Sequence, residues 1–194
     1  WSQAQREAAF TPAAAMEITK QIREHAADGT VGAWTNSVTT LPGAKIDYRF
    51  RLTNGTERPR SGLVAYDVFP HVGDVGIPQG RNSNFANTYD PTREVTLPEG
   101  YTISYYNGDA WPVYDGSSQD DVENVLAGLA WEPTPSVTTK AVRIEQQPNV
   151  ELMGGQTIEF ILPFSANAER LDAYGNPPQD LVGKAAYNLS LIHI

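Results

Sequence analysis

The sequence predicts an all-β protein: a Greek-key β-sandwich with long loops and one short helix. Several segments of the 194-residue chain alternate apolar and polar side chains, so each strand turns one face to a core and the other to water. The 16 glycines and 14 prolines, with abundant threonine, tyrosine and asparagine, suit strands joined by many turns. The segments amount to about eight to ten strands, at the spacing typical of a sandwich.

The N-terminal part divides at residue 16. Residues 1–15 are rich in alanine and glutamine and are predicted to form an arm or linker, and residues 16–192 a single domain. The first strand is expected at residues 16–23, and its apolar face carries Met16, Ile18, Lys20 and Ile22. Lys20 is the exception on this face, because burying a lysine is costly unless its charge is paired or neutralised.

The central stretch, residues 44–74, is expected to hold two strands around a polar turn. The core face of the first strand carries Ile46, Tyr48, Phe50 and Leu52. Asn54 and Gly55 predict the turn, because both residues tolerate a positive φ. The second strand, residues 63–69, is apolar on both faces except for Asp67, and Pro70 ends it. This carboxylate inside an apolar strand complements Lys20.

The following segments are mostly loops. A short strand is expected near Trp34 and Val38, within the loop at residues 26–44. Longer polar loops are expected at residues 71–94 and 107–119, and long loops in compact domains are often functional. Two short strands, residues 95–97 and 101–106, are predicted around the turn formed by Pro98, Glu99 and Gly100.

One helix is predicted within residues 118–130. The helical spacing i, i+3, i+4, i+7 is found at Val122, Val125, Leu126 and Leu129, and acidic residues precede it, which favours a helix N-terminus. Three further strands are expected at residues 138–146, 156–164 and 184–192. Residues 189–194 resemble a translated sequencing-adapter tail, so we expect the natural chain to continue differently there.

Composition excludes several classes of function. The formal charge of −9 argues against nucleic acid and anionic membranes as partners. With no cysteine, thiolate zinc sites, catalytic thiols and disulfides are excluded, and the three histidines are too dispersed in sequence to predict a multi-histidine metal site. No apolar run is long enough to span a membrane, and no export-signal pattern occurs, so we expect any such signal to lie outside this sequence. No hydrolase, nucleotide-binding or zinc-protease motif is found, and we expect no enzyme activity on an external substrate.

The motif Y-x-F-x-L-T-N-G followed by S-G-L-V-A-Y-D-V-F-P-H-V-G-D, within residues 44–74, resembles the repeated immunoglobulin-like domains of Gram-positive, actinobacterial-type cell-wall proteins and adhesins. The resemblance implies an immunoglobulin-like sandwich in an extracellular protein that is anchored to the cell wall or secreted. It further implies a structural stalk or adhesive module. Its partners would be neighbouring domains of the same protein and a host glycan or host protein.

The same resemblance implies a self-formed isopeptide bond among Lys20, Asp67 and Asn188. In the collagen-adhesin A-type domains, a lysine on an early strand attacks an asparagine side chain on the last strand, a buried acid shuttles protons, and ammonia leaves. Burial favours the neutral amine and the neutral acid that this chemistry needs. The alternative interpretations are a buried salt bridge between Lys20 and Asp67, or a lysine that reaches water. Strand alternation, moreover, turns Asn188 away from the core.

Two other functions stay open from the sequence. The loop aromatics Tyr89, Trp111 and Tyr114 could bind a carbohydrate or host protein, although aromatic residues also build cores. The chain could also be an accessory domain of a secreted glycoside hydrolase. No cofactor is expected, but two groups of loop residues have side-chain oxygens of the kind that bind calcium. The same residue types, Asn and Asp, are also common in loops because they form turns. These groups are Asp74 with Asn82, Asn84 and Asn87, and Asn107 with Asp109, Asp115, Asp120 and Asp121.

Overall fold

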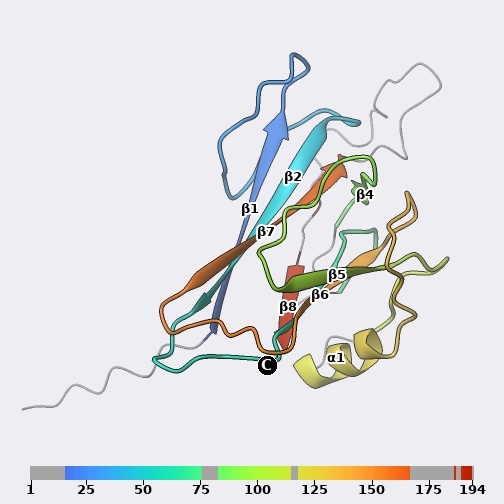
Figure 1. The fold of residues 1–194 in the computed structure, drawn as a ribbon. Helices are drawn as coiled ribbons and strands as arrows, with labels where there is room; N and C mark the ends of the chain where they lie inside the picture. Colours follow the sequence, from blue (N-terminus) through green and yellow to red (C-terminus); the bar gives the residue numbers. More distant parts are fainter. Residues whose placement is uncertain (1–15, 76–82, 115–117, 167–185, 187–188, 194) are drawn as a thin grey trace, which may run out of the picture.

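Two antiparallel sheets of four strands each form a β-sandwich, with one short helix beside the second sheet (Figure 1). The computed structural model describes residues 16–75, 83–114, 118–166, 186 and 189–193. The prediction of an all-β sandwich with one short helix is confirmed. The predicted N-terminal arm, residues 1–15, and most of the segment before the last strand lie outside the described residues.

The first sheet has the strand order β1-β2-β7-β4. Its strands are β1 (Met16–His25), β2 (Lys45–Asn54), β7 (Thr157–Ser165) and β4 (Thr88–Tyr89). Strand β4 lies in a segment that the sequence predicted as loop, because two residues are too short to show a period. The strand predicted at residues 95–97 is wrong in extent, since only an isolated bridge joins Thr96 to Ile161 there. The loop around Trp34 likewise forms isolated bridges at Val31 and Thr35.

The second sheet has the strand order β5-β6-β3-β8. Its strands are β5 (Tyr101–Tyr106), β6 (Ala141–Gln146), β3 (Val64–Val68) and β8 (Leu189–His193). Gly100 has a φ of 81° just before β5, a left-handed conformation that glycine adopts without strain. The turn predicted at Pro98–Gly100 is thus present.

Strands that follow each other in the sequence mostly lie in opposite sheets. The chain crosses between the sheets after β2, β3, β4, β6 and β7, and it stays within one sheet from β1 to β2 and from β5 to β6. These crossings are the connections of a Greek-key sandwich. They bring the inner face of β1 opposite the inner face of β3, which places the two exceptional residues, Lys20 and Asp67, between the same two layers.

The core lies between the inner faces of the two sheets. The alternating residues of β2 are at most 6% exposed, as the sequence pattern predicted. The cluster that surrounds them includes Val142 and Ile144 of β6, and Ile158, Phe160, Leu162 and Phe164 of β7. Burying one such side chain stabilises the fold by roughly 1.5–3 kcal/mol, so this interior is the main source of stability.

The turn after β2 is built by the side chain of Asn54 and not by a positive φ. Asn54 Nδ2 donates hydrogen bonds to Arg58 O and Leu152 O, both at 2.8 Å. Its Oδ1 accepts from Thr56 N at 3.0 Å and from Thr56 Oγ1 at 2.7 Å. The side chain is fully buried, so these bonds compensate its desolvation and fix the exit from β2. The positive φ in this segment falls at Gly62 instead, just before β3.

The helix α1 (Gln119–Ala127) covers part of the outer face of the second sheet and lies beside β6 in Figure 1. Its N-cap is Ser118, whose Oγ accepts a hydrogen bond from Asp121 N at 3.1 Å. Val122 and Leu126 pack against a second apolar cluster that includes Tyr66 and Val68 of β3. Within the described part of the chain, no helix is long and apolar enough to cross a membrane.

Candidate functional site

Lys20 and Asp67 meet between the two sheets. Lys20 lies on β1 opposite Phe50 of β2, and Asp67 lies on β3 opposite Val142 of β6. Lys20 Nζ donates a hydrogen bond to Asp67 Oδ1 at 3.0 Å. The side chain of Lys20 is 17% exposed and that of Asp67 is 5% exposed. The structure therefore brings together two of the three residues that the sequence singled out.

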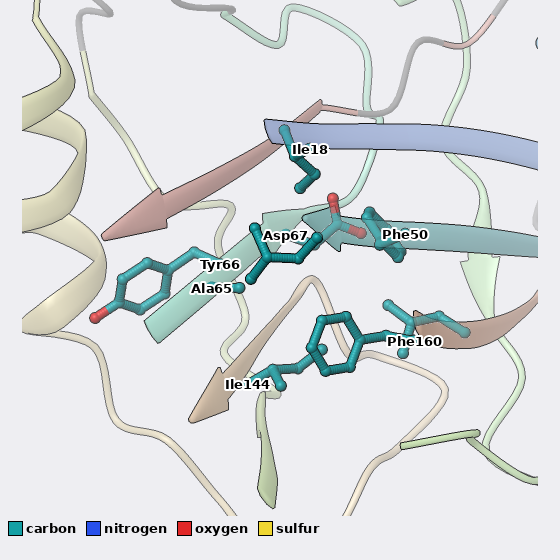
Figure 2. A pocket seen from close by; sticks show the side chains of 9 residues that line it. Ile18, Phe50, Ala65, Tyr66, Asp67, Ile144 and Phe160 are labelled. Carbon is teal, nitrogen blue, oxygen red and sulfur yellow. The ribbon is translucent and has the colours of Figure 1, made fainter. Parts of the chain in front are cut away.

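The surroundings of this pair are apolar and aromatic. Lys20 Nζ lies 4.2 Å from the ring centroid of Phe50 and 5.0 Å from that of Tyr48, within the range of cation–π attraction. A cavity of about 10 Å³ borders Asp67 (Figure 2). Its other described lining residues are Ile18, Phe50, Leu52, Ala65, Tyr66, Ile144, Phe160 and Leu162. Charges are poorly screened in such surroundings, so the pair attracts strongly but pays a large desolvation cost.

The third predicted member, Asn188, lies outside the described residues. Strand β8 follows it in the sequence and pairs antiparallel with β3, so that Ser190 lies opposite Asp67. The last strand therefore runs beside the strand that carries the acid. The expectation that alternation turns Asn188 away from the core stays a prediction.

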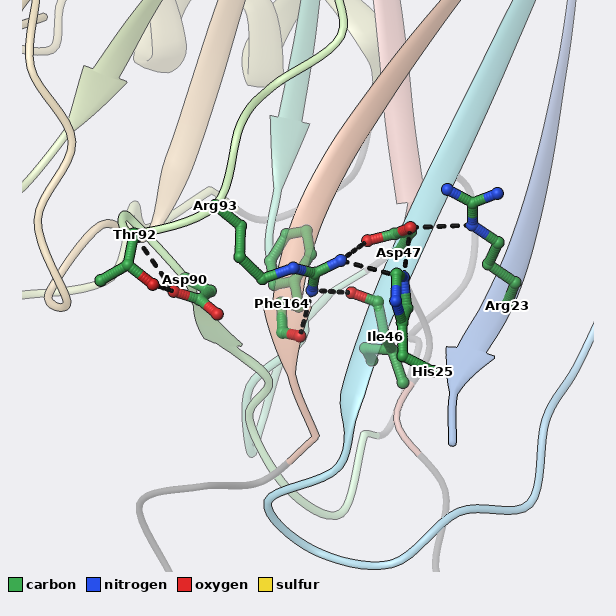
Figure 3. Close-up of polar contacts among 8 residues, drawn as sticks. All are labelled: Arg23, His25, Ile46, Asp47, Asp90, Thr92, Arg93 and Phe164. Atoms are coloured by element: carbon green, nitrogen blue, oxygen red, sulfur yellow. Dashed lines mark hydrogen bonds and ion pairs between the residues drawn. The ribbon is translucent and has the colours of Figure 1, made fainter. Parts of the chain in front are cut away.

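A second buried carboxylate, Asp47, lies on the opposite face of the first sheet (Figure 3). Arg23 Nε donates to Asp47 Oδ2 at 2.8 Å, and His25 Nε2 lies 2.7 Å from the same oxygen. Arg93 Nη2 bonds to Asp47 Oδ1, and Arg93 Nη1 donates to Ile46 O at 3.1 Å. The cluster of Arg23, His25, Asp47 and Arg93, called the Asp47 cluster below, thereby joins β1, β2 and the segment after β4.

Two opposing effects act on the pKa of Asp47. Burial is the larger single effect and raises this pKa, because it disfavours the charged carboxylate. The hydrogen bonds from His25 and Arg23 and the charge of Arg93 lower it, and together they hold the pKa below its usual value of 3.8. Asp47 therefore stays ionised near neutral pH and holds the three basic side chains around it in place.

The Asp47 cluster was not predicted from the sequence. Alternation places Asp47 and Arg23 on solvent-facing sides of their strands, so both were expected to be exposed. One of the residues that contact Asp47 is Arg93, which lies 46 residues away in the sequence, in a loop. The sequence did contain one indication of this cluster, because oppositely charged residues lie on the outer faces of two adjacent strands. The register between these strands was unknown, so the sequence could not show which charges meet.

The three predicted ligand-binding aromatics have different environments. Tyr89 is 1% exposed and stacks on Phe69 with ring centroids 5.7 Å apart, so it is a core residue that presents no ring face to solvent. Trp111 is half-buried and stacks on the imidazole of His71, with centroids 4.0 Å apart. Tyr114 is half-buried and packs against the cluster beneath α1. Ligand binding by Trp111 and Tyr114 stays a prediction.

Several residues of the two groups considered for calcium form internal hydrogen bonds, among them Asp74, Asn87 and Asn107. Asp74 is 3% exposed and accepts from Ser83 N at 2.9 Å and from Ser83 Oγ at 2.7 Å. Asn87 Nδ2 donates to the hydroxyl oxygen of Tyr48 at 2.8 Å. Asn82 and Asp115 lie outside the described residues. Among the residues that are described, no cluster of three or more histidines and carboxylates could hold a metal ion.

Comparison with known proteins adds no assignment. No family model matches the chain, and no curated protein matches its sequence. The functional argument therefore depends on the geometry of the two charged sites and on the motif within residues 44–74.

Proposed function

We propose that this protein is a force-bearing stalk or adhesive module of an extracellular bacterial surface protein, in which a covalent bond between Lys20 and Asn188 reinforces the sandwich. One observation carries the proposal: Lys20 Nζ lies 3.0 Å from Asp67 Oδ1 between the two sheets, in apolar and aromatic surroundings. A lysine and an acid held in contact in such surroundings are the two groups that the resembling domains use. Apolar side chains at these two positions would avoid the desolvation cost of burying charges, so a purely structural core would favour them.

The bond-forming step uses only groups of this chain. The neutral amine of Lys20 attacks the side-chain carbonyl carbon of Asn188, so a C–N bond forms and the bond to the amide nitrogen breaks. Asp67 takes a proton from the attacking amine and delivers one to the departing nitrogen, which leaves as ammonia. Asp67 is unchanged at the end, and the step needs no external reactant. The cavity beside Asp67 has about the volume that a molecule the size of water or ammonia needs.

Two physical effects favour such a bond. Groups held in contact by a fold react as if at very high concentration, which replaces a separate catalyst. A link from residue 20 to residue 188 would also close most of the chain into one loop. By the chain-entropy estimate, closing a loop of that length stabilises the folded state by about 5 kcal/mol. The bond would also join an early strand to a late segment. These two parts of the chain are the ones that a force applied at the chain ends would separate first.

The first test is the intact mass of the purified, denatured protein. We expect a mass that is lower than the calculated mass by one ammonia, and tandem mass spectrometry should find Lys20 joined to Asn188. The matched control is Lys20→Arg, which keeps the positive charge but removes the nucleophilic amine and should show the full calculated mass. A full mass for the natural sequence would contradict the bond and leave a non-covalent pair. Loss of one water would indicate a link to a carboxylate and would exclude Asn188.

A further inference from the structure

The outer face of the first sheet is basic, although the whole chain has a formal charge of −9. This surface, called the outer face below, consists of the odd-numbered side chains of β1, β2 and β7, because their even-numbered partners point into the core. With Arg93 it carries five cations (Arg23, Lys45, Arg49, Arg51 and Arg93) and three carboxylates (Glu17, Asp47 and Glu159). Its sign is therefore opposite to that of the protein as a whole.

Trp34 orients two of these cations. The guanidinium carbon of Arg23 lies 4.3 Å from the Trp34 ring centroid, and that of Arg49 lies 4.4 Å from it. The residue after Trp34 is bridged to Ile22 of β1, which holds this part of the loop against the sheet. Cation–π stacking uses the flat face of a guanidinium and leaves its N–H edge directed elsewhere.

Two arginines of the outer face have hydrogen-bonding capacity to spare. Arg23 uses Nε for Asp47, and its two terminal nitrogens make no hydrogen bond within the described part of the chain. Arg51 is 49% exposed, and its nearest ion-pair contact there is Glu159 at 3.9 Å, too long for a hydrogen bond. Arg49, in contrast, bonds to Gln21 and lies 3.4 Å from Glu159. The outer face thus presents guanidinium donors on both sides of the Trp34–Arg49 stack.

We infer that the outer face binds an acidic polysaccharide. Guanidinium groups pair in a forked geometry with carboxylate or sulfate groups, and the neutral side chains of Thr19, Thr53 and Thr157 on the same face can bond to sugar hydroxyls. Neighbouring side chains on one face of a strand are about 7 Å apart. That spacing suits a polymer with sparse charges better than double-stranded DNA, which carries one charge per about 1.7 Å of helix axis.

This inference does not depend on the proposed covalent bond. Lys20 points into the core from β1, whereas Arg23 and Arg51 point away from it. Variants on the outer face should therefore keep a mass that is lower by one ammonia than their own calculated mass, and a Lys20→Arg variant should leave glycan binding unchanged. Failure of one idea is thus distinguishable from failure of the other.

The test is the affinity of the full chain for polygalacturonate, a polymer of uronic acid, at low ionic strength. We expect Arg51→Glu to weaken binding at least about tenfold, because it replaces a charge-assisted donor with a repelling carboxylate. The matched control is Arg58→Glu, a charge reversal at an exposed arginine in the turn after β2, which should change affinity less than about twofold. Thermal unfolding of both variants checks that they are folded.

Three results would overturn the inference: no binding of polygalacturonate by the natural sequence, equal affinity of the natural and Arg51→Glu proteins, or equal affinity for neutral dextran. Stronger binding of polyphosphate than of polygalacturonate would assign the outer face to dense polyanions and would also overturn it. Loss of binding as the salt concentration rises to about 0.15 M would support it, because the interaction between exposed charges is then screened beyond about 8 Å.

Discussion

Asp67 and Asp47 are both buried, but their partners differ. The Asp67 side chain is 5% exposed and bonds to Lys20, between two sheets, beside Phe50 and an apolar cavity. The Asp47 side chain is 4% exposed and bonds to Arg23, His25 and Arg93 on the outer face. The first site places charge in apolar surroundings, whereas the second surrounds one carboxylate with donors.

This difference distinguishes an ion pair in apolar surroundings from a carboxylate that several donors stabilise. A buried ion pair in apolar surroundings recovers little of its desolvation cost, so its presence is weak evidence for stabilisation. A carboxylate with several charge-assisted hydrogen bonds is held in one geometry. The Asp47 cluster thus fixes β1 and the segment after β4 to β2.

The largest expected effect is that of Asp67→Ala. It would leave Lys20 buried without this carboxylate, and we expect a loss of about 3–5 kcal/mol in the free energy of unfolding, measured by urea denaturation. In an Asn188→Ala background, which cannot form the proposed bond, the double variant Lys20→Met with Asp67→Leu should recover most of the loss caused by Asp67→Ala, because it removes both charges. If Asp67→Ala were nearly neutral, the interior pair would not be desolvated as the geometry indicates.

Asp47→Ala should cost less, about 1–3 kcal/mol. The side chains of its partners Arg23, His25 and Arg93 are 19–24% exposed, so water can partly replace the lost carboxylate. The measurement is the same urea titration, run beside Asp67→Ala. A larger loss for Asp47→Ala than for Asp67→Ala would reverse the comparison and show that the outer cluster is the more desolvated one.

Acid should weaken the Asp47 cluster. The pKa of Asp47 is lower in the folded protein than its usual value of 3.8, so the unfolded chain binds the proton more readily. Its contribution to stability is therefore fully present above the usual value and is lost as the pH falls below 3.8 towards the folded-state pKa. The stability difference between the natural protein and Asp47→Asn should accordingly shrink in that range. A stability difference between the two proteins that stays constant as the pH falls below 3.8 would contradict this account.

The smallest expected effect on stability is that of Arg51→Gln. Arg51 is half exposed and its contact with Glu159 is 3.9 Å, so the free energy of unfolding should change by less than about 0.5 kcal/mol. Thermal or urea unfolding checks this value. The same variant should weaken binding of polygalacturonate, so stability and binding are predicted to separate at this residue. A clear loss of stability would assign Arg51 a structural role.

Much of the fold could be predicted from alternation within single segments. The core face of β2 and the exceptional positions of Lys20 and Asp67 follow from a period of two, because successive side chains of a strand point to opposite faces. The helix followed from its own spacing and from the acidic residues near its N-terminus, whereas the N-cap at Ser118 was seen only in the structure. These features are local, so a short stretch of sequence contains all the information they need.

The features that the sequence did not reveal depend on contacts between distant segments. Strand alternation could not show that Asp47 is buried, because one of its partners, Arg93, comes from a separate loop. It could not show that Tyr89 is a core residue, because a strand of two residues has no visible period. The turn at Asn54 depends on Leu152, 98 residues further along the chain.

The sequence by itself thus determined which side of each strand is apolar and which charged residues violate that rule. The tertiary structure alone decided that Lys20 faces Asp67 and that Asp47 gathers Arg23, His25 and Arg93. The physical reason is that a period of two specifies the faces of a strand but not its neighbours. Strand order, register and loop position are set by how all the apolar faces pack together at once.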